Sequence, residues 1–360
     1  MLRGRAGGKD TSLKWIIHVV SSIVLRVFFR RIEVVGAELV PRSGGVLFVI
    51  NHPSGLIDPA LIFAALPRHA TFLAKAPLFE VPIVRVLVKA WEALPVHRRV
   101  DTNGIVVAGD NDETFEKCFA ILRQGHALAL FPEGVSHDAP QLLPLKTGAA
   151  RIALGAADDS AARVQIVPVG IYYTSKTQFR SEALVHFGAA FDAPSGTPLE
   201  GDGTPPRAAV GALHARIHEA LRAVTLNTET NDALKDVRKA ERLFSSIYET
   251  ITIRESLARQ FERLQRFAEV WRTDEVPHDA RRSLLQKHIA EYEEGLKTLG
   301  LRPAHLACAS FAQLCLSPRG SANCATDSDF TARSRWTCGS LPGLPLERIN
   351  RTTICQARCG

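Results

Sequence analysis

No apolar run in this sequence is long enough to cross a bilayer as a helix, which takes about 20 such residues. The strongest candidate, residues 15–25, is much shorter and lies between Lys14 and Arg26. It shows no small-residue cleavage site of the signal-peptide kind. Because Trp15 and its apolar neighbours have basic flanks, we expect residues 1–30 to form an amphipathic helix lying in the membrane interface. The alternative is a helix that packs on the protein.

Cysteine is scarce in most of the chain, since six of the seven cysteines fall in the last 60 residues. None of their spacings is C-x-x-C, so the pattern gives little support for zinc. Residues 304–360 are rich in Ser, Thr, Gly, Arg and Pro and show no periodicity, so we expect a disordered tail. An out-of-frame extension would produce the same abrupt change in composition. The six cysteines are Cys308, Cys315, Cys324, Cys338, Cys355 and Cys359.

The sequence also lacks a strong excess of either positive or negative charge. The net charge is +7, with 46% hydrophobic and 22% charged residues, as in ordinary globular proteins. No basic helix interleaved with aromatic residues is present, so we expect no nucleic-acid partner. Attraction to anionic lipid, phosphate or coenzyme A groups explains the charge at least as well.

Alternating strand-like and helix-like segments indicate an α/β fold. We expect a mixed, partly parallel sheet flanked by helices, with an N-terminal amphipathic helix and a C-terminal helical appendage. The Gly- and Pro-rich residues 194–206 indicate a surface loop. The expected strands are residues 46–50, 127–131, 164–173 and 183–187, with weaker candidates at 31–35 and 70–73. The expected helices are residues 59–66, 82–93, 112–124 and 148–157.

The C-terminal half of the chain changes character after the loop. Residues 207–301 are rich in Glu, Arg, Ala and Leu and are expected to be helical, with a break near residues 275–277. These patterns divide the chain into an interface helix, a main domain, a helical appendage and a tail, at residues 1–30, 31–225, 226–303 and 304–360.

The most informative motif is a histidine and an aspartate in the segment 51–59. His52 follows the apolar run 46–50, a buried strand, while Asp58 and Pro59 look like the N-cap and first residue of a helix. In a loop between strand and helix the two side chains can meet. The carboxylate would then orient the imidazole, which could deprotonate a hydroxyl. The alternative is that Asp58 only caps the helix and His52 only satisfies backbone groups.

Two further segments carry groups suited to binding phosphate and hydroxyl groups. Arg98 and Arg99 can grip a phosphate at two points, although such a pair is more often merely solvated. Glu133 and Gly134 follow the strand 127–131, where an α/β sheet builds its ligand crevice. The glutamate can accept hydrogen bonds from hydroxyls, and the glycine lets the backbone come close. A plain Pro-Glu-Gly turn is the alternative.

A fourth segment, residues 167–171, combines a proline and a glycine within a strand. Pro168 and Gly170 indicate a bulge or a close approach by a ligand. No G-x-S-x-G elbow is present, and three neighbours such as Ser136, His137 and Asp138 cannot converge as a triad, which disfavours a serine hydrolase.

Taken in order, these four segments resemble those of the glycerolipid acyltransferase family, which acylates glycerol-3-phosphate or lysophosphatidate. The resemblance covers about residues 30–225. It implies acyl transfer from acyl-CoA or acyl-carrier protein to a hydroxyl in phospholipid biosynthesis, without a metal or other cofactor. It also implies membrane association at the cytoplasmic face. A thioesterase using the same pair and a non-catalytic lysophospholipid-binding protein remain the alternatives.

The resemblance also assigns roles to individual residues. It makes His52 the general base and Asp58 its orienting carboxylate. Arg98 matches the phosphate-binding arginine, and Glu133 with Gly134 matches the acceptor-binding "F-P-E-G" pattern. The remaining residues expected at the substrate site are Asn51, Arg99 and Lys146, the last beside a helix N-terminus that suits an anionic phosphate.

Two departures from the family pattern bear on the acceptor. Five residues separate His52 from Asp58 where the commonest pattern has four, and a branch resembling glycerol-3-phosphate acyltransferases carries the longer spacing. Residues 135–137 read Val-Ser-His instead of Thr-Arg-Ser, which removes one expected phosphate contact. Arg99 or Lys146 could replace it. Both acceptors therefore remain open.

Overall fold

The structure is a computed structural model that describes residues 8–97, 112–158, 163–201, 203–248, 255–272 and 278–300. The chain divides into two units, Met1–Ala309 and Ser310–Gly360, and every described residue belongs to the first. The whole of the expected tail, residues 304–360 with its six cysteines, lies outside the described residues, so its disorder stays a prediction.

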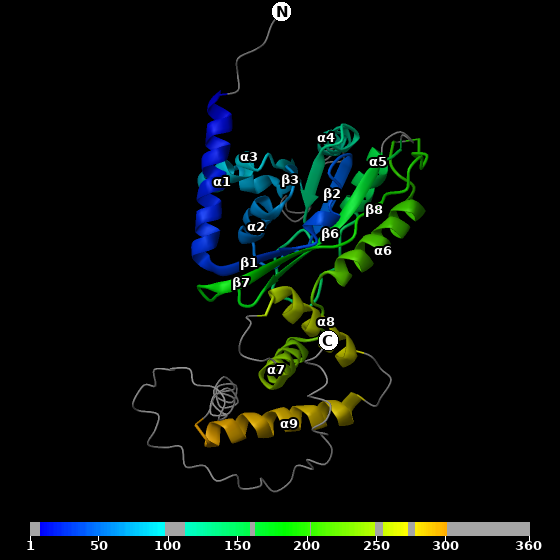
Figure 1. Ribbon diagram of the computed structural model, residues 1–360. Helices are drawn as coiled ribbons and strands as arrows, with labels where there is room; N and C mark the ends of the chain where they lie inside the picture. The colour runs from blue at the N-terminus through cyan, green and yellow to red at the C-terminus, as the bar shows by residue number, and fades with distance from the viewer. Residues whose placement is uncertain are drawn as a thin grey trace, which may run out of the picture. The chain divides into compact units, whose positions relative to one another are not determined.

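A mixed sheet forms the centre of the protein (Figure 1). Its strands lie in the order β1-β7-β6-β2-β5-β3-β4, with β8 also paired to β6. Strand β2 is parallel to both β5 and β6, whereas β7 and β8 run antiparallel to β6. This confirms the expected mixed, partly parallel sheet. The strands are β1 (Phe29–Val35), β2 (Gly45–Ile50), β3 (Ala70–Lys75), β4 (Leu94–Val96), β5 (Ala127–Leu130), β6 (Val164–Tyr173), β7 (Ser181–Phe187) and β8 (Phe191–Asp192).

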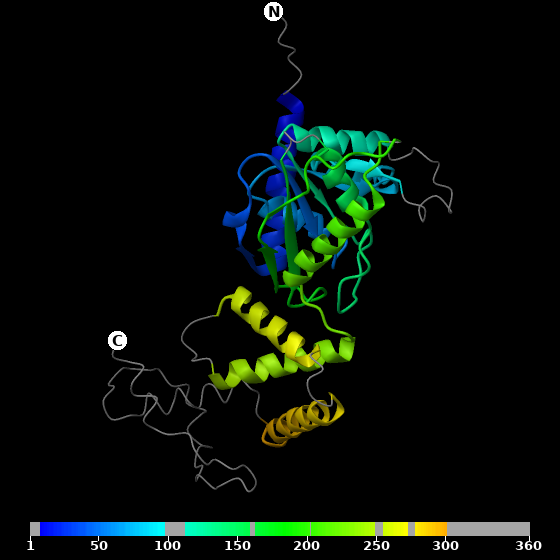
Figure 2. The ribbon, with the colours of Figure 1, turned by 90° about the vertical axis from the view of Figure 1, so that its right-hand side faces the viewer.

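Helices cover both faces of this sheet (Figures 1 and 2). Along β2, Val46 and Phe48 pack in the core formed with α1, α2 and α3, while Leu47 and Val49 pack in the core formed with α4, α5 and α6. All of β2 is buried, which explains its unbroken apolar run. The helices are α1 (Gly8–Phe28), α2 (Ile57–Ala65), α3 (Pro82–Ala90), α4 (Asp112–Arg123), α5 (Gly148–Ala156) and α6 (Arg207–Ala223).

The proline and glycine of β6 have partners within the chain. The pairing of β2 with β6 keeps its register through Pro168, so no bulge interrupts it. A Cβ on Gly170 would lie 1.8 Å from the carbonyl oxygen of Val224, which follows α6. The glycine therefore permits close packing of the backbone after α6, and the expected bulge is wrong. The close approach is made by the chain itself.

The helical appendage consists of α7 (Asn231–Tyr248), α8 (Leu257–Arg272) and α9 (His278–Thr298). Phe261 and Leu264 of α8 form a third core with Tyr172 and Leu184 of the sheet. The carboxylate of Glu33 in β1 accepts the backbone N–H groups at the start of α8, at 2.9 and 3.1 Å. This satisfies two of the donors that a helix leaves unpaired at its N-terminus and ties α8 to the sheet.

Helix α1 supplies the N-terminal helix that the sequence predicts, and it packs against α2, α3 and β1. Within the described part of the chain, no helix has both the length and the hydrophobicity needed to cross a membrane.

Candidate active site

The candidate site lies where β2 and β5 end. Because these strands are parallel neighbours, their C-terminal ends lie at the same edge of the sheet. His52 comes two residues after β2, and Glu133 comes three residues after β5. This edge is where open α/β sheets build ligand crevices.

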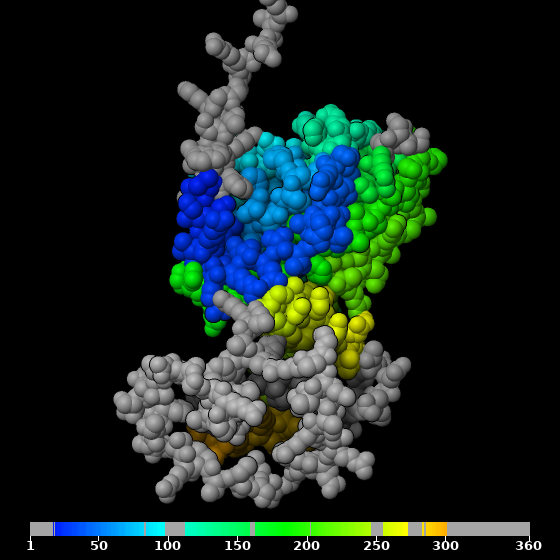
Figure 3. Space-filling model, in the orientation of Figure 1, coloured from blue at the N-terminus to red at the C-terminus, as the bar shows by residue number. Residues whose placement is uncertain are grey.

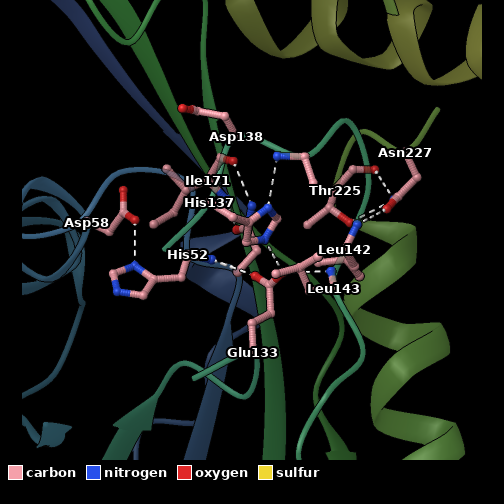
Figure 4. Close-up of polar contacts among 12 residues, drawn as sticks. His52, Asp58, Glu133, His137, Asp138, Leu142, Leu143, Ile171, Thr225 and Asn227 are labelled. Carbon is pink, nitrogen blue, oxygen red and sulfur yellow. Dashed lines mark hydrogen bonds and ion pairs between the residues drawn. The ribbon is translucent and has the colours of Figure 1, made fainter. Parts of the chain in front are cut away.

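His52 and Asp58 form the expected pair. The ring Nδ1 of His52 lies 2.7 Å from Oδ2 of Asp58 (Figure 4). An ionised carboxylate can only accept, so the proton is on Nδ1 and the lone pair of the ring is on Nε2. The ring stacks on Phe131, with 4.2 Å between ring centroids, which fixes its plane. In the neutral tautomer that this contact favours, Nε2 is the nitrogen that can accept a proton.

Asp58 lies in the first turn of α2, not at its N-cap. The helix begins at Ile57, and its N-cap residue, Leu56, makes no side-chain cap hydrogen bond. The expected N-cap role is therefore wrong, and the helix start was misplaced by two residues. The carboxylate turns back toward the loop, where the backbone N–H of Ser54 donates to Oδ2 at 2.6 Å. The short loop thus closes on Asp58 and brings it to His52.

Tyr173, the last residue of β6, is a partner of Asp58 that sequence reasoning missed. Its hydroxyl donates to Oδ1 of Asp58 at 2.6 Å. Burial, together with the Asp58 carboxylate, raises the pKa of Tyr173 well above its ordinary value. The available signal in the sequence was a tyrosine at the end of a buried strand, whose hydroxyl needs a partner. Nothing in the sequence pointed to Asp58 as that partner.

Glu133 holds the loop that carries His52 through contacts other than those of Asp58. Its Oε1 accepts the backbone N–H of His52 at 2.8 Å, and its Oε2 accepts the N–H of Leu143 at 2.9 Å (Figure 4). Oε2 also contacts Nε2 of His137, whose Nδ1 accepts the N–H of Ala139 at 3.1 Å. His137 therefore donates to Glu133 from Nε2. The Glu133 side chain is fully buried, and its carboxylate has protein partners on both oxygens; binding of an acceptor hydroxyl stays a prediction.

Asn51 is also occupied by the protein. Its side-chain amide donates to the carbonyl of Ile171 at 3.1 Å and accepts the N–H of the same residue at 2.7 Å. The amide thereby continues the pairing of β2 with β6 past Ile50, where the backbone leaves the sheet. The expected substrate contact of Asn51 stays a prediction, and its visible role is to fix the start of the loop.

An apolar cavity of about 460 Å³ has His52 among its lining residues. Its walls include Leu78 and Val88 from one helical layer and Ile152 from the other, with Trp91 among its aromatic residues. The volume is in the range of small-ligand pockets, which bury most of a ligand against apolar side chains. The cavity is large and apolar enough to take a hydrocarbon chain next to His52.

Comparison with known proteins agrees with this geometry. The model of the family described as Acyltransferase matches residues 31–172. Glycerol-3-phosphate O-acyltransferase 2 of Saccharomyces cerevisiae is 34% identical over 201 residues, or 54% of this chain and 25% of that protein. A 1-acyl-sn-glycerol-3-phosphate acyltransferase of Borreliella burgdorferi is 24% identical over 145 residues, or 40% of this chain and 52% of that protein. Over residues 31–172, this chain is therefore similar to the family described as Acyltransferase.

The chain spans only part of the proteins that it resembles, a quarter of the yeast protein and about half of the bacterial one. Among solved structures, this chain is similar to the 1-acyl-sn-glycerophosphate acyltransferase PlsC of Thermotoga maritima. The matched region covers 61% of this chain and 83% of the PlsC chain. Its sequence identity is 18% and the TM-score is 0.42.

The structure describes some of the residues expected to bind anions, whereas others lie outside the described residues. Lys146 and Gly134 both line the cavity, and a Cβ on Gly134 would lie 2.9 Å from Cε of Lys146. Gly134 has a φ of 72°, a left-handed conformation that favours glycine. Lys146 comes two residues before the start of α5. Arg98 and Arg99 lie outside the described residues, so their roles stay predictions.

Proposed function

We propose that this protein is an O-acyltransferase that moves a fatty acyl group from a thioester to a hydroxyl of glycerol-3-phosphate or 1-acyl-glycerol-3-phosphate, a step of phospholipid biosynthesis. The observation that carries the proposal is the oriented Nε2 of His52 beside an apolar cavity. Among the described residues no hydrogen bond occupies that nitrogen. The donor thiol is coenzyme A or acyl-carrier protein.

The reaction needs one base and no protein nucleophile. Nε2 of His52 takes the proton of the acceptor hydroxyl as the hydroxyl oxygen attacks the thioester carbonyl. The tetrahedral intermediate expels the thiolate, which takes the proton back from the imidazolium. The negative Asp58 stabilises the imidazolium while it exists. Cys118, the cysteine in the described part of the chain, is buried, and burial raises its pKa to about 12, so it is no thiolate nucleophile.

The cavity supplies the binding energy for the acyl chain. Its lining is mostly apolar, and moving hydrocarbon from water into such a site is favourable by about 0.8 kcal/mol per methylene. The chain would lie between Trp91 and Ile152, with its thioester at His52. The cations Lys75 and Lys146 on the cavity wall suit a phosphate of acceptor or donor. Arg98, which lies outside the described residues, stays the arginine that we expect to bind this phosphate.

Helix α1 would hold the enzyme at a membrane surface, where its substrates are. Ile17 and Leu25 face the protein and are buried. Beside this buried side, α1 exposes an apolar stripe at helical spacing, which we call the α1 stripe, and α1 lies at the surface of the molecule (Figure 3). Exposed Arg26 lies within the same turns, which suits an interfacial helix on anionic lipid. The α1 stripe consists of Val20, Ile23, Val24 and Val27, which are 52%, 55%, 58% and 55% exposed.

Replacement of the base tests the proposal. We expect His52→Ala to lower kcat for acyl transfer at least about a hundredfold, because general-base catalysis contributes on that scale. The measurement offers glycerol-3-phosphate and lysophosphatidate with both acyl-CoA and acyl-carrier protein. His69→Ala, at an exposed histidine, is the matched control. A folded His52→Ala protein with full activity on any of these pairs would refute the role of His52.

Substitution of Glu133 distinguishes two possible roles of this residue: holding the loop that carries His52, and binding the acceptor. Glu133→Gln replaces one accepting oxygen by an NH₂ group, leaving a buried N–H without its acceptor, at a cost of about 1–3 kcal/mol in unfolding free energy. We expect kcat to fall while the KM for the acceptor stays within about twofold. The control is Glu116→Gln on the exposed face of α4. A raised acceptor KM with unchanged stability would show instead that Glu133 binds the acceptor.

Vesicle binding tests the α1 stripe. The double variant Ile23→Asp, Val24→Asp places two carboxylates where apolar side chains would enter the interface, so it should abolish co-sedimentation with anionic phospholipid vesicles. Leu299→Asp, at an exposed leucine after α9, should bind as the unchanged protein does. If the double variant, the Leu299→Asp variant and the unchanged protein bind vesicles equally, α1 does not hold the protein at the membrane. Acyl transfer to soluble glycerol-3-phosphate should survive in the double variant.

A further inference from the structure

Asp58 carries a second side-chain contact besides His52, on its other oxygen. The hydroxyl of Tyr173 donates to Oδ1 at 2.6 Å, while Nδ1 of His52 lies 2.7 Å from Oδ2. We propose that Tyr173 is a positioning residue of acyl transfer, which orients the Asp58 carboxylate and limits its affinity for the proton of His52. This inference rests on the proposed function, because it acts through the same base.

The position of the Tyr173 hydroxyl is fixed by its surroundings. Tyr173 is 4% exposed, and its ring stacks on Phe29 with 5.5 Å between centroids and 11° between planes. Two residues earlier on β6, Ile171 is clamped by both ends of the Asn51 amide. Strand β6 and the loop that carries His52 are therefore held to each other at this point. The phenol reaches Asp58 from a rigid strand, not from a mobile loop.

The carboxylate depends on neutral donors. Asp58 is fully buried, and the groups seen to donate to it are the N–H of Ser54, the Tyr173 hydroxyl and Nδ1 of His52. Each donor stabilises the ionised form, and hydrogen bonds to charged groups are stronger than those between neutral groups. Tyr173 stays protonated through the working pH range, because burial and then Asp58 raise its pKa. It is a permanent donor.

Loss of this donor has a defined effect on the pair. Without the phenol, Oδ1 becomes a buried acceptor with no partner, and the excess negative charge of the carboxylate acts on the His52 imidazolium. The ring then keeps its proton to a higher pH, and the carboxylate is free to rotate. The other titratable groups near the pair are unchanged: Glu133 and His137 behind the His52 backbone, and Lys75 and Lys146 on the cavity wall.

The chain offers a matched control one residue away. Tyr172 is also a buried tyrosine of β6, but it packs on Phe261 of α8, in the core between sheet and appendage. Tyr172→Phe removes a buried hydroxyl from the same strand without touching Asp58. Any effect that comes only from loss of a buried hydroxyl should appear in both variants.

The test compares pH profiles of kcat/KM for Tyr173→Phe, Tyr172→Phe and the unchanged protein, with KM and thermal stability measured alongside. For Tyr173→Phe we expect kcat to fall about tenfold, the size of one lost hydrogen bond to a charged group. KM should stay within about twofold, and the acid limb of the profile should move to higher pH. Tyr172→Phe should leave kcat and the acid limb unchanged.

Several outcomes would overturn the proposal. An unchanged kcat and acid limb in Tyr173→Phe, or equal changes in both variants, would reduce Tyr173 to a structural residue. If Tyr173→Phe does not fold, Phe29→Leu loosens the ring and keeps the hydroxyl; kcat should then fall severalfold, and an unchanged kcat would refute the positioning role. Full activity of His52→Ala would instead refute the proposed function, whatever Tyr173→Phe does.

Discussion

The buried carboxylate of Asp58 is the constraint on which the site depends. A carboxylate without access to water must be surrounded by donors, and here three donors come from two segments: His52 and Ser54 from one loop, and Tyr173 from strand β6. Meeting this requirement fixes the tautomer of His52 and leaves Nε2 as its open nitrogen. The same requirement explains why the loop turns back on the first turn of α2. The chemistry and the local fold thus have one cause.

The loop that carries His52 is held in part by Glu133 and Asn51, two residues that the sequence predicts at the substrate site. Glu133 accepts the backbone N–H of His52, and the backbone N–H of His137 donates to the carbonyl of His52 at 3.2 Å. The side-chain amide of Asn51 makes two hydrogen bonds to the backbone of Ile171. Parallel strands bring these segments together, because β2 has β5 on one side and β6 on the other. His52 is therefore held by a rigid frame at the wall of the apolar cavity.

Local patterns predicted much of this protein. The apolar runs of β2 and β6 predicted the bounds of these two strands closely. The loop predicted between β2 and α2 led to the expected contact between His52 and Asp58, which the structure contains. The start of α2 was misplaced because Pro59 suggested the first helical residue, whereas the turn begins at Ile57. Short strands such as β4 and β8 exist through their pairing with longer neighbours, which no local pattern shows. Tyr173 could not be found because it meets Asp58 across 115 positions, through the order of the strands.

The central claim is direct transfer from thioester to alcohol with His52 as the base. The most direct measurement follows thiol release from acyl-CoA with and without glycerol-3-phosphate or lysophosphatidate, together with the intact mass of the protein during turnover. The account predicts that thiol is released only with an acceptor, one for each acylated product, and that no acyl group becomes attached to the protein. Equal thiol release without an acceptor, or a stable acyl-protein that is competent to react, would contradict it.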